Sequence, residues 1–112
     1  MANKNAKISK KRDFDNIFKK GKLARGNFLI IRFLKNNENI NRFAFIVSKK
    51  VSLKAVDRNK IRRRLFEATK EYKKIPAGMD VIFIVLPTAK QQKFLEIKEE
   101  ACTLLDKIIK NR

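Results

Sequence analysis

The sequence predicts a single α+β domain in which helices cover one β-sheet. At 112 residues the chain has room for one hydrophobic core, and its 44% apolar content favours a packed globule over a disordered chain. Apolar residues recur with a period of 2 in some segments and of 3.6 in others, which are the periods of strands and helices. In chain order these periods predict helix, strand, strand, helix, strand and helix.

The first predicted helix covers residues 11–20. Phe14, Ile17 and Phe18 share one face at helical spacing, and lysines occupy the last turn. Gly21 follows at the position where helices commonly end. On this spacing the two phenylalanines are core residues, with stacking on unpaired bases as the alternative. We expect Phe14 to be partly exposed and Phe18 to be more nearly core.

Two strands follow, at 27–35 and 42–49, and the polar residues 36–39 between them predict a hairpin-type turn. Alternation along the second strand separates two faces, one with Phe43, Phe45 and Val47 and the other with Ala44, Ile46 and Ser48. From 57 to 73 the apolar period changes to 3.6, which predicts a helix.

The remaining residues predict a central strand and a final helix. Residues 81–86 are apolar at every position, which favours a strand buried on both faces, and Pro87 closes it. Residues 89–110 place their apolar side chains on one helical face. Cys102 lies on that side, and we interpret it as a small buried hydrophobe.

The chain is strongly basic. It carries 29 Lys and Arg against 11 Asp and Glu, a formal net charge of +18. Self-repulsion of that size opposes folding, so a polyanionic partner is the natural explanation. The charge concentrates in residues 1–25 and 49–64, and we expect residues 1–10 to form a flexible basic terminus. The single domain, 1–112, is therefore predicted to bind a nucleic acid.

The densest basic segment, 49–64, holds eight basic residues and one acid. Guanidinium groups grip phosphates with paired N–H donors, and the first turn of a helix adds backbone donors. The candidate RNA-binding residues are Lys49, Lys50, Arg58, Asn59, Lys60, Arg62 and Arg63. The alternative is an ordinary solvated helix face, and Asn59 could instead cap the start of the helix.

Composition excludes several kinds of chemistry. The chain has no histidine and one cysteine, which rules out Ser/His/Asp and Cys/His catalysis, a Cys/His zinc site and an internal disulfide. Its acids are scattered, without the clustering that a Mg²⁺-dependent nuclease needs. No apolar run approaches the roughly 20 residues that cross a membrane. We expect a cytoplasmic protein with no metal site and no catalytic groups of its own.

Three segments carry specific motifs. They are DFDNIFKKG at 13–21, RFAFIVSKKV at 42–51 and AVDRNKIRRRL at 55–65. Together they resemble the protein subunit of bacterial ribonuclease P, and the resemblance extends over essentially the whole chain. It implies an α-β-β-β-α-β-α sandwich with a four-stranded sheet, a left-handed βαβ crossover and a short extra strand near 22–26.

The same resemblance implies a function. Such proteins assemble, about one per RNA and without an obligate protein partner, with a catalytic RNA that removes the 5′ leader of precursor tRNA in a Mg²⁺-dependent endonucleolytic reaction. The RNA carries the catalytic groups, and the protein binds both that RNA and the leader. Carried over by motif, the RNA-binding residues are the seven named above, and the leader-cleft residues are Phe14, Phe18, Leu29, Ile31 and Ser48.

The chain departs from the pattern of that family at a few positions. The loop 52–54 is longer than usual and lacks a glycine, Ala44 replaces a common glycine, and Phe66 stands where arginine or lysine is common. Ile31 occupies a leader-facing position that is aromatic in some members. The alternative function is that of a ribosomal or other structural RNA-binding protein, which the charge alone would equally permit.

Overall fold

The computed structural model describes residues 5–110. In chain order its elements are β1 (Asn5–Lys7), α1 (Lys11–Lys20), β2 (Lys22–Arg25), β3 (Leu29–Lys35), β4 (Asn41–Val47), α2 (Ala55–Glu71), β5 (Met79–Val85), the 3-10 helix η1 (Pro87–Gln91) and α3 (Phe94–Lys110). The predicted α+β domain is confirmed, although its sheet has five strands instead of four. The short strand implied near 22–26 is β2.

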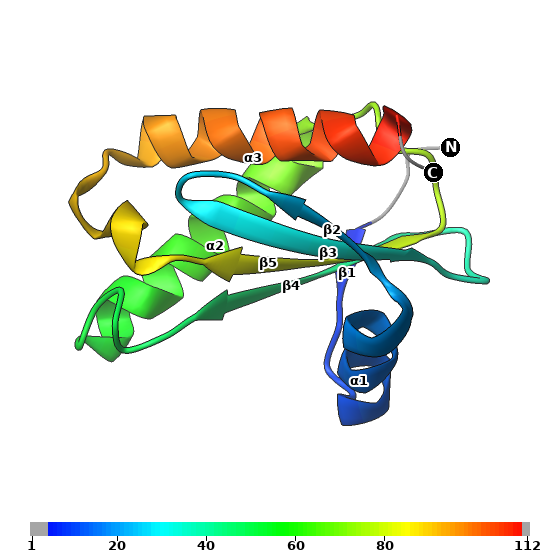
Figure 1. Cartoon of the computed structure of the whole chain (residues 1–112), viewed down its shortest axis with the longest axis horizontal. Helices are drawn as coiled ribbons and strands as arrows, with labels where there is room; N and C mark the ends of the chain where they lie inside the picture. The colour runs from blue at the N-terminus through cyan, green and yellow to red at the C-terminus, as the bar shows by residue number, and fades with distance from the viewer. Residues whose placement is uncertain (1–4, 111–112) are drawn as a thin grey trace.

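All five strands form one sheet, in the order β1-β4-β5-β3-β2. β5 pairs parallel with β4 and antiparallel with β3. Helices α2 and α3 lie on one face of the sheet and α1 lies on the other (Figure 1). Because α1 has only ten residues, it covers one part of its face and leaves the rest uncovered by any helix.

β5 lies at the centre of the sheet, as its apolar sequence predicts, and six of its seven residues are buried. It also separates β3 from β4. The predicted hairpin is therefore wrong, because the polar residues 36–39 connect two strands that each pair with β5 and not with each other. Placing β5 between them pairs both of its edges with apolar strands, which an edge position would not do.

The alternation of the strands divides the apolar side chains into two clusters. The larger cluster lies between the sheet and helices α2 and α3, and it includes Leu29 and Ile31. The smaller cluster lies beneath α1 and includes Ile17, Ala44 and Ile82. The two faces predicted for β4 are confirmed, because its odd-numbered apolar residues pack with the larger cluster and Ala44 packs with the smaller one.

The N-terminal segment joins the sheet. β1 pairs parallel with residues 41–43 of β4, and Ile8, which follows it, is 6% exposed and packs in the smaller cluster. The prediction of a flexible terminus over residues 1–10 is therefore wrong from residue 5 onward, because an apolar anchor and a free strand edge hold this segment. Residues 1–4 of that prediction lie outside the described residues.

Several element boundaries differ from the predicted ones. α2 covers residues 55–71, where the apolar period predicted 57–73. The single helix predicted at 89–110 is divided into η1 and α3. Pro87 starts η1, and Gln92 ends it with an extended backbone (φ −95°, ψ 147°), so the chain changes direction before α3 begins.

α1 has the predicted bounds, but Gly21 ends it for a steric reason. Its backbone is extended (φ −74°, ψ 157°) and lies outside the left-handed region that often favours glycine at this position. A β-carbon at this position would lie 2.4 Å from the carbonyl oxygen of Ile17 and 3.0 Å from that of Phe33. Glycine therefore lets the chain leave α1 closely packed against β3 and enter β2 at once.

Candidate nucleic-acid interface

The face of the sheet that carries α1 is only partly covered. Ala44 and Ile82 lie beneath α1 and are buried. The next cross-strand row pairs Ile30 with Ile84 and Ile84 with Ile46. Ile30 and Ile84 are half-buried, and Ile46 is 37% exposed. We call these three isoleucines the apolar strip.

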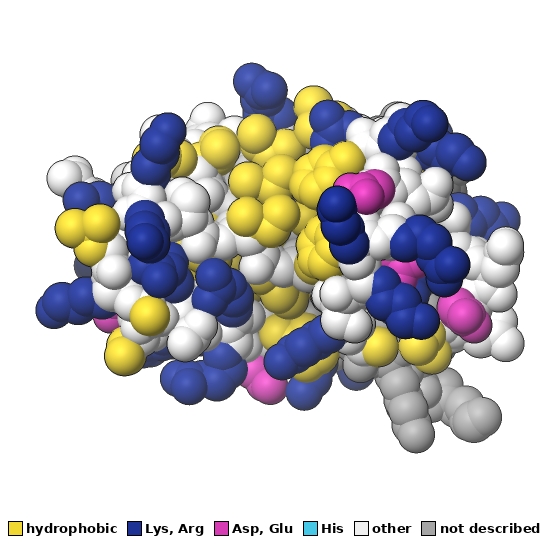
Figure 2. All heavy atoms as spheres, turned by 90° about the horizontal axis from the view of Figure 1, so that it is seen from below, with side chains coloured by type: hydrophobic (Ala, Val, Ile, Leu, Met, Phe, Trp, Pro, Cys, Tyr) yellow, Lys and Arg dark blue, Asp and Glu magenta, His cyan; other side chains and the backbone are white. Residues whose placement is uncertain are grey.

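Basic side chains surround the apolar strip. Arg25 pairs with Ile30 at one end of the row, while Lys49 and Lys50 follow β4 at the other end and are exposed. Figure 2 shows apolar side chains gathered near the middle of this face, with lysines and arginines around them. Single-stranded nucleic acids bind such surfaces, because their bases pack on apolar groups while cations hold their phosphates.

α1 presents two phenylalanines to this face. Phe14 is half-buried against the smaller cluster. Phe18 is 38% exposed, and the guanidinium carbon of Arg32 lies 5.6 Å from the centre of its ring. Nη1 of Arg32 also donates to the Phe18 carbonyl oxygen at 3.0 Å. The expected order is therefore reversed, because Ile17 takes the core position and Phe18 is the more exposed ring.

Two predicted leader-cleft residues lie on the opposite face of the sheet. Leu29 and Ile31 are completely buried in the larger cluster, so both predictions are wrong. Their neighbours Ile30 and Arg32 face the α1 side instead. Side chains alternate along a strand, so an error of one residue in register moves a side chain to the other face. Ser48, the last predicted cleft residue, is exposed just after β4.

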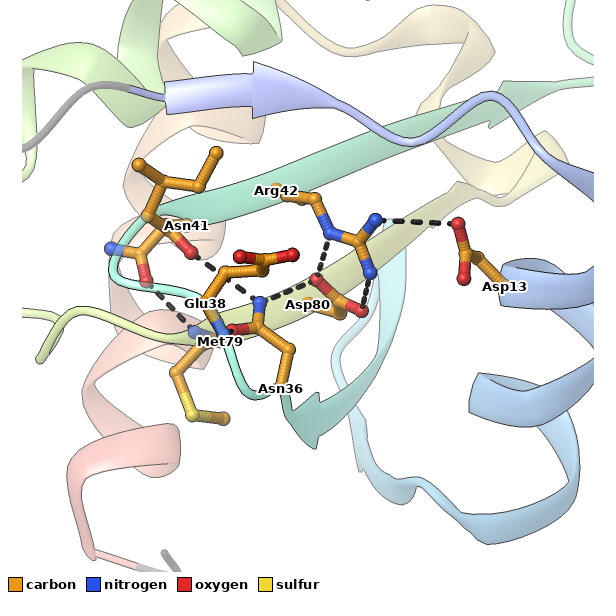
Figure 3. Close-up of polar contacts among 8 residues, drawn as sticks. Asp13, Asn36, Glu38, Asn41, Arg42, Met79 and Asp80 are labelled. Carbon is orange, nitrogen blue, oxygen red and sulfur yellow. Dashed lines mark hydrogen bonds and ion pairs between the residues drawn. The ribbon is translucent and has the colours of Figure 1, made fainter.

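A polar network ties α1 to the sheet (Figure 3). Asp80 of β5 is 4% exposed, and its carboxylate accepts two hydrogen bonds from Arg42 at 2.7 and 2.6 Å. Asn36 donates to the same carboxylate at 2.7 Å, and Arg42 also donates to Asp13 of α1 at 3.3 Å. The hydrogen bond to Asp80 is the main cause that raises the pKa of Arg42. The first turn of α1 is thereby fixed to β4 and β5.

Sequence analysis missed this network, because Asp13 and Asp80 were interpreted as scattered acids. The available signal was the position of Asp80 directly before an apolar run predicted to be buried. A buried carboxylate needs a partner to offset the loss of its hydration. Nothing local in the sequence identifies Arg42 as that partner, since the two residues meet only when β4 and β5 pair.

The loop before α2 is held by its own polar groups. Nη1 of Arg58 donates to the carbonyl oxygens of Ser52 and Leu53 at 2.9 and 3.0 Å. The Ser52 hydroxyl donates to Asp57 at 3.2 Å. A guanidinium has five N–H donors, so these bonds fix the direction of Arg58 while leaving other donors for a phosphate.

Asn59 does not cap α2. The helix begins at Ala55, with Lys54 in the capping position, so Asn59 lies inside the helix and the capping alternative is wrong. Its Oδ1 accepts a hydrogen bond from Nη1 of Arg62 at 2.7 Å. Nη2 of the same arginine donates to the Val47 carbonyl oxygen at 3.3 Å. Asn59 therefore orients Arg62, and Arg62 ties α2 to the end of β4.

The other predicted RNA-binding residues are exposed. Lys49 and Lys50 lie in the turn after β4 rather than at the end of the strand, and Lys60 and Arg63 lie on α2. All seven residues thus lie between the end of β4 and the first half of α2, but Asn59, Arg62 and Arg63 line a hollow beside β4, while Lys60 lines a separate one with Phe94.

The described residues offer few groups for other chemistry. In residues 5–110, no three side chains of His, Cys, Asp or Glu gather closely enough to hold a metal ion. Cys102 is half-buried, and burial is the main cause that raises the pKa of its thiol. Over the same range, no helix is long and apolar enough to span a lipid bilayer.

Sequence comparison connects the chain to proteins of one kind. The sequence model of the family described as Ribonuclease P matches residues 2–109. The ribonuclease P protein component of Clostridioides difficile is 36% identical over 111 residues, which cover 97% of this chain and 90% of that protein. The corresponding component of Syntrophomonas wolfei is 32% identical over 108 residues, which cover 96% of this chain and 90% of that protein.

Structural comparison gives the same result. The RNase P protein of Staphylococcus aureus superposes with a TM-score of 0.83 at 32% identity, covering 92% of this chain and 94% of that one. The RNase P protein of Thermotoga maritima superposes with a TM-score of 0.81 at 29% identity, covering 90% of this chain and 96% of that one. Both the sequence and the fold are therefore similar to those of ribonuclease P proteins over nearly their full length.

Proposed function

The chain belongs to the ribonuclease P protein family, and on that premise we propose that it binds a catalytic RNA together with the 5′ leader of precursor tRNA. In this proposal it is the protein subunit of a tRNA-processing endoribonuclease that hydrolyses the bond between leader and mature tRNA. One protein joins one RNA in the cytoplasm, and no further protein is required.

The observation that carries the proposal is the uncovered apolar strip beside α1. Its isoleucines are partly exposed, and Phe18 adds an exposed aromatic ring on the same face, against Arg32 of β3. Bases of a single-stranded leader can pack there, and each base–aromatic stack contributes about 1–3 kcal/mol. A folded tRNA keeps most of its bases paired and stacked, so this surface favours the leader.

The basic region around α2 suits the catalytic RNA. Arg58 and Arg62 are held in place by bonds to backbone carbonyl oxygens, so their remaining donors are oriented before an RNA arrives. Lys60 and Arg63 are exposed on the same helix. Neutralising phosphates with such cations releases counterions, which supplies affinity without requiring a particular sequence. The leader and the catalytic RNA would thus contact adjacent surfaces.

We assign the hydrolytic chemistry to the RNA. Mg²⁺-dependent cleavage needs oxygen ligands arranged around the metal, and the described carboxylates do not form such a group. Asp80 and Asp13 are already engaged by Arg42. The described residues therefore do not fit a Mg²⁺ site, and in this proposal the RNA and its substrate would hold the ions.

The test compares precursor and mature tRNA in the presence of the cognate catalytic RNA. We expect the protein to increase the affinity for precursor tRNA and to leave that for mature tRNA unchanged. An equal increase for both would favour the alternative of a structural RNA-binding protein. Protein freed of RNA should leave precursor tRNA intact, and cleavage by such protein would contradict the assignment of catalysis to the RNA.

A further inference from the structure

A groove of about 690 Å³ opens between β4 and α2. β1 pairs only with residues 41–43, so among the described residues β4 has no strand partner on this side beyond Phe43. The groove follows that free edge. Its lining includes Lys7, Phe14, Asn59, Arg62, Arg63, Phe66 and Lys70.

Phe66 forms an aromatic wall of the groove. It lies on α2 and is half-buried, and its ring meets that of Phe45 edge-on, with centroids 6.2 Å apart and planes at 75°. Phe45 in turn stacks on Phe83, with centroids 5.3 Å apart, and Phe83 is completely buried. Phe66 is thus supported by the core, while part of its surface faces the groove.

Cations gather over this ring. The ammonium nitrogens of Lys7 and Lys70 lie 5.2 and 4.7 Å from the ring centroid of Phe66, and two arginines of α2 line the same groove. Glu67 is the one acid among the described lining residues, and Lys70 pairs with it at 3.4 Å. The groove therefore combines a fixed aromatic surface with an excess of positive charge.

We propose that this groove binds one unpaired nucleotide of the catalytic RNA, with its base stacked on Phe66. The two lysines have long flexible stems, so their ammonium groups can move from the ring to the phosphates on either side of the stacked base. The inference rests on the proposed function, which assigns the neighbouring arginines of α2 to the catalytic RNA. Phe66 would thus offer an aromatic surface at a position where arginine or lysine is common in the family.

The first test measures assembly with the cognate catalytic RNA. Phe66→Leu keeps an apolar contact with Phe45 but removes the aromatic surface, so we expect affinity to fall about 5- to 150-fold. Phe66→Trp should bind as the wild type does. Neither change removes a charge, so the slope of log affinity against log salt should stay constant. Phe94→Leu is the matched control, since Phe94 is also half-buried beneath a guanidinium, that of Arg64 at 5.5 Å, but lies outside the groove.

The second test gives a result with the wild-type protein alone, whether or not Phe66→Leu folds. The wild-type protein is titrated with a short single-stranded RNA oligonucleotide and with the same oligonucleotide carrying abasic riboses. We expect the abasic RNA to bind more weakly to the wild type, and Phe66→Leu to narrow this difference without abolishing it, because the apolar strip and Phe18 also pack bases. Equal binding of both RNAs by the wild type would overturn the subsite even if Phe66→Leu failed to fold.

The outcomes separate this inference from the proposed function. If Arg63→Ala weakens assembly and flattens its salt dependence while Phe66→Leu assembles normally, the subsite is refuted and the proposed function stands. A loss of precursor tRNA affinity in Phe66→Leu with unchanged assembly would assign the groove to the leader and overturn our choice of RNA. If the wild-type protein does not assemble with the catalytic RNA, the proposed function fails as well.

Discussion

The two faces of the sheet are built from the same three central strands but differ in what covers them. The closed face packs against α2 and α3, and its strand residues Leu29, Ile31 and Phe83 are completely buried. The open face carries only α1, and the apolar strip beyond that helix remains accessible. Neighbouring residues of β5, Phe83 and Ile84, thus belong to different environments.

The closed face is also fixed at its edge. Glu100 of α3 accepts hydrogen bonds from the backbone N–H groups of Asn27, Phe28 and Leu29 at 2.6, 2.7 and 2.8 Å. The turn between β2 and β3 is therefore held against α3. The closed face therefore supplies most of the folding free energy, and the open face is the one on which we propose that RNA binds.

The largest expected effect comes from the closed face. Phe83→Ala should lower the free energy of unfolding by about 3–5 kcal/mol, because it removes a buried ring and leaves a cavity. Ile46→Ala on the open face should cost about 1 kcal/mol or less, since that side chain is already partly in water. Urea denaturation measures both. Similar losses for the two variants would show that the faces do not differ in this way.

The next effect concerns the polar network of Asp13, Arg42 and Asp80 that joins α1 to the sheet. Asp80→Ala removes the buried partner of Arg42, and we expect a loss of about 2–3 kcal/mol in the free energy of unfolding. This lies below the value for a fully buried pair because the Arg42 side chain is 23% exposed. Asp13→Ala breaks only the longer contact to α1 and should cost about 1 kcal/mol or less. An Asp80→Ala protein as stable as the wild type would contradict the anchoring role of the network.

Local sequence signals were sufficient where one segment decides its own structure. α1 has its predicted bounds because Phe14, Ile17 and Phe18 fix its apolar face and Gly21 ends it. β5 is central because every residue from 81 to 86 is apolar. The basic residues at the end of β4 and on α2 lie near one another because they belong to one continuous segment, 49–64.

The features that were predicted wrongly or not at all depend on contacts between segments that are distant in the sequence. Leu29 and Ile31 were carried over to the leader cleft by motif, and which face of β3 they take is decided only when that strand pairs with β2 and β5. The insertion of β5 between β3 and β4 is decided by burial summed over three strands. β1 has only three residues, too few to show a period, and Arg42 meets Asp80 only through strand pairing.

A smaller effect should appear in RNA affinity and not in stability. Phe18 is the exposed ring beside the apolar strip, so Phe18→Ala should lower the affinity of the assembled enzyme for precursor tRNA by about 1–3 kcal/mol. Mature tRNA should bind as before, because it has no leader. The free energy of unfolding should fall by less than about 1 kcal/mol. A large loss of stability would instead place Phe18 in the core.

The smallest effect tests the contact between the two helices of the closed face. The Tyr72 hydroxyl donates a hydrogen bond to Asp106 of α3, and burial, followed by that bond, raises the pKa of Tyr72. A raised pKa means that the folded protein holds the phenolic proton more tightly, so this contribution to stability is complete below pH 10 and is lost as pH rises further. Tyr72 is the only tyrosine, so phenolate absorbance reports its ionisation alone, which should begin at higher pH in folded than in unfolded protein. Tyr72→Phe should lower the free energy of unfolding by about 0.5–1.5 kcal/mol at neutral pH. The free energy of unfolding of this variant should then fall less above pH 10 than that of the wild type. Ionisation at the same pH in both states would show that α2 and α3 are not joined through this bond.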